Sequence, residues 1–215
     1  MSNCNRYCYD CFNHPRFEDR KQGKMQIKTY HRVIRGLELM NFKGRLGLYM
    51  CNEPLLDRRM FKLVQYAKEK LPECNILIAT NGDFLNKKKY LSLMKAGVDR
   101  ILVTDYGPPW TLNKMDHPKI DYRKHTEITK ANRAGKLYSH NGPIDRPCSR
   151  VENQLAINWK GEVVLCCCDY YGEYVFGNVR NLLLEKIWND PKFMLVRQIL
   201  ADNRTNLDFC KYCDL

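Results

Sequence analysis

The cysteines constrain this chain more than any other feature, because eleven of them occur in 215 residues and most are grouped. No apolar signal-peptide core follows the first residues, and no run of about eighteen apolar residues occurs. The sequence therefore predicts a cytoplasmic protein with reduced thiols, in which grouped cysteines indicate metal binding rather than disulfides. The groups are Cys4, Cys8 and Cys11; Cys166, Cys167 and Cys168; and Cys210 and Cys213.

The charge is strongly positive, with 36 Lys and Arg against 24 Asp and Glu and a formal net charge of +12. A basic chain usually meets something anionic, such as nucleic acid, a phosphorylated small molecule or an acidic protein. A solvated surface of lysine and arginine is the competing interpretation. With 44% hydrophobic residues the chain can bury a core, so a disordered protein is not expected.

The first half of the sequence alternates between apolar runs typical of strands and helical patterns. Such alternation predicts an α/β fold with a parallel sheet and crossover helices, in which ligands bind beyond the carboxyl ends of the strands. From about residue 140 the pattern changes to a hairpin, turning at Lys160-Gly161, followed by two helices. We therefore expect two domains, 1–139 and 140–215. The expected strands are 45–51, 75–80, 101–103, 120–128, 155–159 and 162–166, and the expected helices are 25–42, 56–71, 87–96, 182–188 and 191–200.

The N-terminal cysteines have the spacing Cys4-x3-Cys8-x2-Cys11. Three thiolates in one short loop can hold three irons of a [4Fe–4S] cluster and leave the fourth iron open to a small molecule, whereas structural metal sites are usually closed by four ligands. A zinc knuckle or a chance spacing is the alternative for this motif taken alone.

This spacing resembles that of the radical S-adenosylmethionine (SAM) superfamily. The resemblance implies that Cys4, Cys8 and Cys11 carry a catalytic cluster whose open iron binds SAM. It also implies that SAM is cleaved reductively to a 5′-deoxyadenosyl radical, which takes a hydrogen atom from the substrate. The cofactor then carries the radical chemistry, while the protein positions and shields it.

Further segments resemble that superfamily where predicted strands end. Asn52-Glu53-Pro54 is similar to its Gly-Gly-Glu-Pro segment, in which the Glu holds the SAM amino group. Thr80-Asn81-Gly82 is similar to a Thr-Asn-Gly at the next strand end. The chain departs from the pattern before the third cysteine, where Asp10, preceded by Tyr9, replaces an aromatic residue. The implied SAM-binding residues are Tyr9, Asp10, Asn52, Glu53, Thr80, Asn81, Thr104 and Asp105.

A second metal site is expected in the C-terminal domain. Cys148, then Gly161-x4-Cys166, then Cys210-x2-Cys213 can bring together four thiolates, which close a cluster. The arrangement resembles the SPASM domain and its shorter relative, twitch, and implies one auxiliary [4Fe–4S] cluster. A zinc site with four cysteines fits the same spacing. Cys167 or Cys168 could replace Cys166, although strand alternation would put Cys167 on the opposite face from its neighbours.

The resemblance implies a partial (β/α)-barrel radical SAM core with a small α+β auxiliary domain. It implies an oxidoreductase that oxidises or modifies a C–H bond of a small substrate, which the charge suggests is anionic, of sugar, aminocyclitol or nucleotide type. An external electron donor such as flavodoxin or ferredoxin is implied, and no membrane partner. The alternatives are a peptide or protein maturase of the same superfamily, and a non-catalytic zinc or iron–sulfur module that binds nucleic acid.

Overall fold

The computed structural model describes residues 2–17, 21–108, 112, 114–127, 132–138 and 142–215. The chain forms two compact units, and each is described by itself. One unit comprises Met1–Asn5 with Leu37–Thr129, and the other comprises Arg6–Gly36 with Lys130–Leu215. The predicted domain boundary falls at residues 139–141, outside the described residues, and it stays a prediction.

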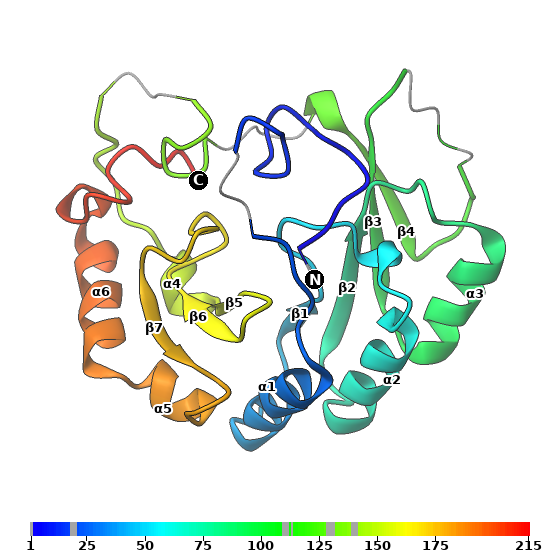
Figure 1. The fold of residues 1–215 in the computed structure, drawn as a ribbon, viewed down its shortest axis with the longest axis horizontal. Coiled ribbons are helices and arrows are strands. Elements are labelled where there is room, and N and C mark those ends of the chain that lie inside the picture. The colour runs from blue at the N-terminus through cyan, green and yellow to red at the C-terminus, as the bar shows by residue number, and fades with distance from the viewer. Residues whose placement is uncertain (1, 18–20, 109–111, 113, 128–131, 139–141) are drawn as a thin grey trace. The chain divides into compact units, whose positions relative to one another are not determined.

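The first unit is built on a four-stranded parallel sheet with strand order β1-β2-β3-β4. Helices α2 and α3 connect consecutive strands and lie on one side of this sheet (Figure 1), and they pack against each other. The predicted α/β class with a parallel sheet is confirmed. The elements of this unit are β1 (Arg45–Gly47), α2 (Met60–Lys70), β2 (Asn75–Thr80), α3 (Lys87–Ala96), β3 (Arg100–Asp105) and β4 (Ile120–Lys124). Helix α1 (Ile27–Leu39) precedes them and belongs to the second unit up to Gly36.

Apolar periodicity explains the core of this unit. Ile76 and Ile78 of β2 are fully buried, and so are Val64 and Ala67 on one face of α2. Local signals set the ends of α3. The side chain of Asn86 accepts a hydrogen bond from the backbone N–H of Lys89 at 2.9 Å, and the helix stops at Gly97 with φ of +102°.

Several predicted boundaries differ from the structure. The strand predicted over 45–51 ends at Gly47, and the helix predicted from residue 56 begins at Met60. Between them Pro54–Leu56 form a short 3-10 helix, η1, because Pro54 is suited to a first helical turn and the side chain of Glu53 caps it. The strand predicted over 120–128 ends at Lys124 and passes into a second 3-10 turn, η2 (His125–Glu127).

The second unit contains a three-stranded antiparallel sheet with strand order β5-β6-β7. The predicted hairpin turns at Gly161, whose φ of +85° favours glycine. Strand β7 and helix α4 were not predicted, because each has only four residues. The elements are α4 (Arg150–Asn153), β5 (Ala156–Ile157), β6 (Glu162–Val164), β7 (Val175–Asn178), α5 (Leu184–Trp188), α6 (Pro191–Asp202) and η3 (Arg204–Asn206).

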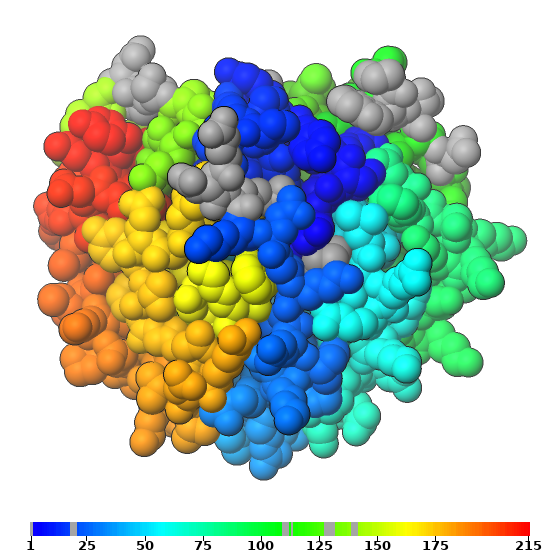
Figure 2. Space-filling view, viewed as in Figure 1, coloured from blue at the N-terminus to red at the C-terminus, as the bar shows by residue number. Residues whose placement is uncertain are grey.

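The last helix, α6, begins as the sequence predicts. The side chain of Asp190 accepts a hydrogen bond from the backbone N–H of Lys192 at 2.9 Å, and Pro191 is the first helical residue. Phe193 and Leu200 point into the core of the unit, whereas Met194 and Leu195 are exposed, and the helix lies at the molecular surface in Figure 2. Within the described ranges, no helix combines the length and the apolar character needed to cross a membrane.

Candidate functional site

Glu53 is the most constrained polar side chain of the first unit. It follows β1, and its side chain is 1% exposed. Its Oε1 accepts hydrogen bonds from Leu55 N at 2.9 Å and Thr80 Oγ1 at 2.7 Å, and its Oε2 accepts one from Asn81 N at 2.8 Å. Burial raises the pKa of this carboxyl, although the same hydrogen bonds act to lower it. The structure therefore holds a preorganised acidic group beside the carboxyl end of β2.

The Thr80-Asn81-Gly82 segment at that strand end contacts the first cysteine of the N-terminal loop. Asn81 Nδ2 donates to Asn5 Oδ1 at 2.9 Å and lies 4.0 Å from Cys4 Sγ. The backbone N–H of Glu53 donates to Asn3 O at 2.9 Å. The structure thus brings together Cys4, Glu53, Thr80 and Asn81, which the sequence separates by up to 77 positions.

The other predicted SAM-binding residues of this unit have partners of their own. The Oδ1 of Asn52 accepts a hydrogen bond from Met50 N at 2.9 Å. The carboxylate of Asp105 pairs with Lys114 Nζ at 2.9 Å, and hydrogen bonds from Lys114 and from the backbone of Gly107 lower its pKa. Thr104 precedes it on β3 and is only partly exposed. A ligand that used Asp105 would have to share it with Lys114.

The remaining N-terminal cysteines belong to the second unit. The backbone N–H of Cys11 donates to Cys8 O at 3.1 Å and closes a turn around Tyr9 and Asp10. Phe12 anchors this turn, because its ring is fully buried and stacks on Tyr170 with centroids 5.1 Å apart.

Tyr9 points outward from that turn. Its side chain is 71% exposed, and the guanidinium of Arg16 lies 4.0 Å from its ring centroid. The proposed contact of Tyr9 and Asp10 with SAM stays a prediction, as do the ligand roles of Cys4, Cys8 and Cys11.

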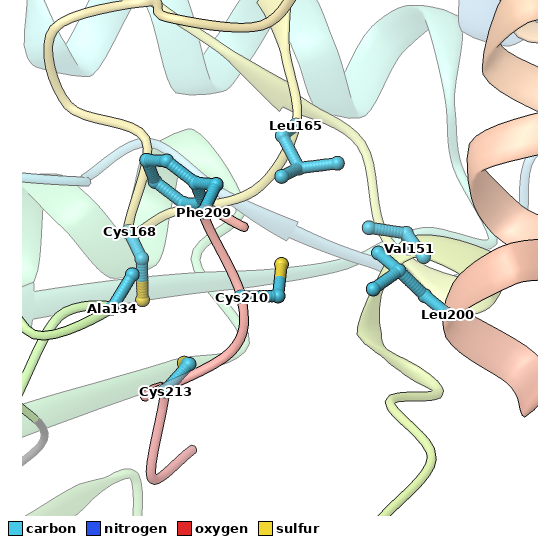
Figure 3. Close-up of a cluster of buried hydrophobic side chains, with 8 residues drawn as sticks. All are labelled: Ala134, Val151, Leu165, Cys168, Leu200, Phe209, Cys210 and Cys213. Atoms are coloured by element: carbon cyan, nitrogen blue, oxygen red, sulfur yellow. The ribbon is translucent and has the colours of Figure 1, made fainter. Parts of the chain in front are cut away.

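Six cysteines gather in the core of the second unit. Cys168, Cys210 and Cys213 are buried in one cluster (Figure 3), and Cys148, Cys166 and Cys167 pack against it. They come from four places in the sequence: the segment before α4, the turn after β6, and two positions after η3. Burial and the nearby thiols of Cys166, Cys213 and Cys148 raise the pKa of Cys210. A positively charged metal centre that binds these sulfurs as thiolates would offset the cost of ionising Cys210 in this buried place.

The sequence interpretation of the three consecutive cysteines needs a correction. Strand β6 ends at Val164, and a turn follows in which Asp169 N donates to Cys166 O at 3.1 Å. The alternation expected of a strand therefore does not decide which of these cysteines faces the cluster. Instead the backbone N–H of Cys168 donates to Cys166 Sγ at 3.3 Å, Cys168 is buried in the cluster, and Cys166 packs against it.

Two buried charged residues that the sequence interpretation missed hold the cysteine segments. The guanidinium of Arg204 is 3% exposed and donates to Pro147 O at 2.9 Å and Cys213 O at 2.5 Å. It thereby joins the segments that carry Cys148 and Cys213. Nothing in the sequence around Arg204 predicts this role, because the residues that it joins are distant from it in the sequence or unrelated to its 3-10 turn.

Asp169 is the second residue, and the sequence interpretation gave it no role of its own. Its carboxylate is 1% exposed and accepts from the backbone N–H groups of Glu173 at 2.7 Å, Tyr174 at 3.0 Å and Leu165 at 3.4 Å. The carboxylate fixes the loop between β6 and β7. Its position next to three cysteines was the signal that could have pointed to it.

The donor sets fit iron–sulfur clusters. All eleven cysteines are free thiols, so neither group is consumed by disulfides. Among the described residues, no three Cys, His, Asp or Glu side chains converge on a point suited to one metal ion. An iron–sulfur cluster ties each thiolate to a different iron, so its ligands need not converge in that way.

Comparison with known proteins covers both units. Residues 148–214 match the family described as the iron–sulfur cluster-binding domain SPASM. The whole sequence is 29% identical to an S-adenosyl-L-methionine-dependent 2-deoxy-scyllo-inosamine dehydrogenase from Niallia circulans, covering 99% of this chain and 89% of the relative.

Two solved structures are similar over the full length of the chain. The crystal structure of BtrN in complex with AdoMet and 2-DOIA matches with a TM-score of 0.89 and 27% identity, and covers 89% of that chain. BtrN in an open conformation matches with a TM-score of 0.80, also at 27% identity and over 88% of that chain.

Proposed function

This chain is a radical SAM enzyme with a C-terminal iron–sulfur domain of the SPASM or twitch type, and we propose that it dehydrogenates a secondary alcohol of an aminocyclitol. The observation that carries the proposal is a likeness to a SAM-dependent aminocyclitol dehydrogenase along almost the entire chain. A likeness confined to the catalytic core would support only the shared chemistry of the superfamily.

SAM and iron–sulfur clusters are the cofactors. When bound, they supply the electron that cleaves SAM and the radical that removes hydrogen from carbon. The chain's own residues bind SAM and orient it. Glu53 accepts the SAM amino group as a charge-assisted hydrogen bond partner, and its three fixed donors, from Leu55, Thr80 and Asn81, keep the carboxylate from turning away. Asn81 links that carboxylate to Cys4 and so aligns SAM with the first cluster.

Removing one hydrogen atom from an alcohol carbon leaves one electron and one proton still to be lost before a ketone is formed. A cluster closed by Cys148, Cys166, Cys210 and Cys213 would be suited to accept this electron, because a cluster with no open iron transfers electrons without binding substrate. Arg204 supports this role, since its buried positive charge faces the segments of two of these thiolates.

The electron for SAM cleavage comes from an external one-electron donor, a flavodoxin or ferredoxin, in the cytoplasm. This part of the proposal is supported by the basic charge of the chain, which complements acidic donor proteins.

The decisive experiment is an anaerobic assay of the reconstituted chain with SAM, dithionite and 2-deoxy-scyllo-inosamine. We expect about eight irons per chain, and we expect the ketone, 5′-deoxyadenosine and methionine in equal amounts. Substrate deuterated at the reacting carbon should transfer its label to 5′-deoxyadenosine.

Two controls give the assay its meaning. The triple variant Cys4→Ala, Cys8→Ala, Cys11→Ala should form none of the three products and hold only the auxiliary cluster. Deoxyadenosine release from the wild-type chain without any ketone would contradict the aminocyclitol substrate and point to the peptide alternative. Zinc instead of iron, with no SAM cleavage, would contradict the enzyme altogether.

A further inference from the structure

The turn after β6 supplies more thiols than an auxiliary cluster can use. Four ligands close such a cluster, whereas six cysteines gather at the site. Three of the four places each offer one obvious thiol, namely Cys148, Cys210 and Cys213. The fourth place offers Cys166, Cys167 and Cys168 together, so the geometry of this turn decides which of them can be the fourth ligand.

Within that turn Cys168 occupies the innermost position. Its side chain is 1% exposed, whereas those of Cys166 and Cys167 are only partly buried. Its thiol neighbours those of Cys166, Cys167 and Cys213, and Cys168 shares one buried cluster with Cys210 and Cys213. Figure 3 shows its side chain in the same buried cluster as Cys210 and Cys213. A thiol that touches two ligand thiols is within reach of the irons that they bind.

Cys166 and Cys168 are also held as a unit. The 3.3 Å hydrogen bond from Cys168 N to Cys166 Sγ and the 3.1 Å hydrogen bond from Asp169 N to Cys166 O fix their relative positions. Asp169 then fixes the whole turn through three backbone N–H groups. The turn therefore presents two thiols to one site without any rearrangement of the backbone.

Cys167 has different surroundings. Its Sγ lies 4.0 Å from Arg133 Nη1, and it is only partly buried, packed against the cluster in which Cys168 is buried. It is the natural control, because it is the adjacent cysteine and is less deeply buried than Cys168.

We propose that Cys168 is a reserve ligand of the auxiliary cluster, which can take the place of Cys166 as the fourth thiolate. The inference rests on the proposed auxiliary cluster and adds a residue to it. A cluster with a choice of fourth ligand survives the loss or oxidation of one thiol, and the exchange changes no charge, because one cysteine thiolate replaces another.

The test counts iron and sulfide in the reconstituted full-length chain, with circular dichroism to confirm the fold. Cys166→Ala should keep about eight irons per chain, and so should Cys168→Ala. The double variant Cys166→Ala/Cys168→Ala leaves three thiolates at the auxiliary site, so it should lose iron to a chelator faster than either single variant. The matched control Cys166→Ala/Cys167→Ala should keep about eight.

The outcomes separate this inference from the proposed function. If Cys166→Ala alone falls to about four irons, or if the control double variant does, Cys168 is not a reserve ligand. Cys148→Ala serves as the reference for a ligand without a substitute. Three thiolates remain in it, so it should lose iron to a chelator faster than Cys166→Ala, in which Cys168 completes the set. Equal rates in these two variants would contradict the reserve role, and wild-type rates in both would contradict the four-thiolate site. The decision does not depend on the Cys166→Ala/Cys168→Ala chain folding, because Cys166→Ala and its control already contradict or support the inference.

Discussion

At the scale of single residues, Glu53 carries the clearest functional prediction. Glu53→Gln replaces a carboxylate with a neutral amide that cannot accept hydrogen bonds on both ends. We expect SAM affinity to fall about 10- to 100-fold, the worth of one charge-assisted hydrogen bond. Anaerobic calorimetry measures it, with Glu69→Gln on the exposed face of α2 as the control. If both variants bound SAM with the affinity of the wild type, the proposed role of Glu53 in binding SAM would be wrong.

The pKa of Glu53 gives a pH dependence with a definite sign. Burial raises this pKa above its usual value, so the carboxyl takes up its proton at a higher pH than an exposed glutamate does. SAM affinity should therefore weaken as the pH falls from 8 toward 5.5, because the protonated carboxyl loses its attraction for the amino group. In Glu53→Gln the slope should disappear. A slope that persists in this variant would assign the titration to another group.

At the scale of elements, the turn after β6 depends on one buried carboxylate. In Asp169→Asn one of the two oxygens becomes an amide nitrogen, which cannot accept. The side chain therefore loses either the hydrogen bond from Glu173 N to Oδ1 or those from Tyr174 N and Leu165 N to Oδ2. We expect the free energy of unfolding to fall by about 1–3 kcal/mol and the auxiliary cluster to be lost faster to a chelator. The control is Asp116→Asn, at an exposed aspartate of the first unit. Equal chelation rates for the two variants would contradict the role of Asp169.

Two glycines with positive φ allow the cost of backbone strain to be distinguished from that of a steric clash. Gly97 has φ of +102°, and an added Cβ would lie 2.6 Å from Lys68 Cγ. Gly107 has φ of +66°, with no atom within 4 Å of an added Cβ. Gly107→Ala should cost about 1–2 kcal/mol from φ alone, and Gly97→Ala should cost more, because Lys68 must also leave its ion pair with Asp99. Thermal unfolding midpoints measure both, and equal shifts would show that Lys68 moves without cost.

At the scale of the whole molecule, the sequence predicted what depends on local pattern. Apolar runs such as Ile76–Ile78 identified the parallel strands, and cap residues such as Asn86 and Asp190 marked helix starts. It did not predict what long-range contacts decide. Strand β7 pairs with β6 across a loop, and Arg204 acquires its role only when segments 57 residues apart meet. The turn at Cys166–Asp169 was misread because one apolar run continued past the point where pairing ends.

The net charge of the whole chain predicts how it receives electrons. Binding of the two clusters by cysteine thiolates lowers the net charge of the chain from +12 to roughly +9. This positive charge still attracts an acidic flavodoxin over several ångströms of water. The rate of reduction by flavodoxin should fall steeply between 0.05 and 0.5 M salt. The screening length is about 10 Å at 0.1 M and shortens as salt is added, so the attraction between the two proteins weakens. Reduced methyl viologen, a cation, should show the opposite trend, because salt screens its repulsion. Stopped-flow absorbance under anaerobic conditions measures both rates. If both fell together, salt would be acting on the protein itself, and the attraction between opposite charges would not explain electron delivery.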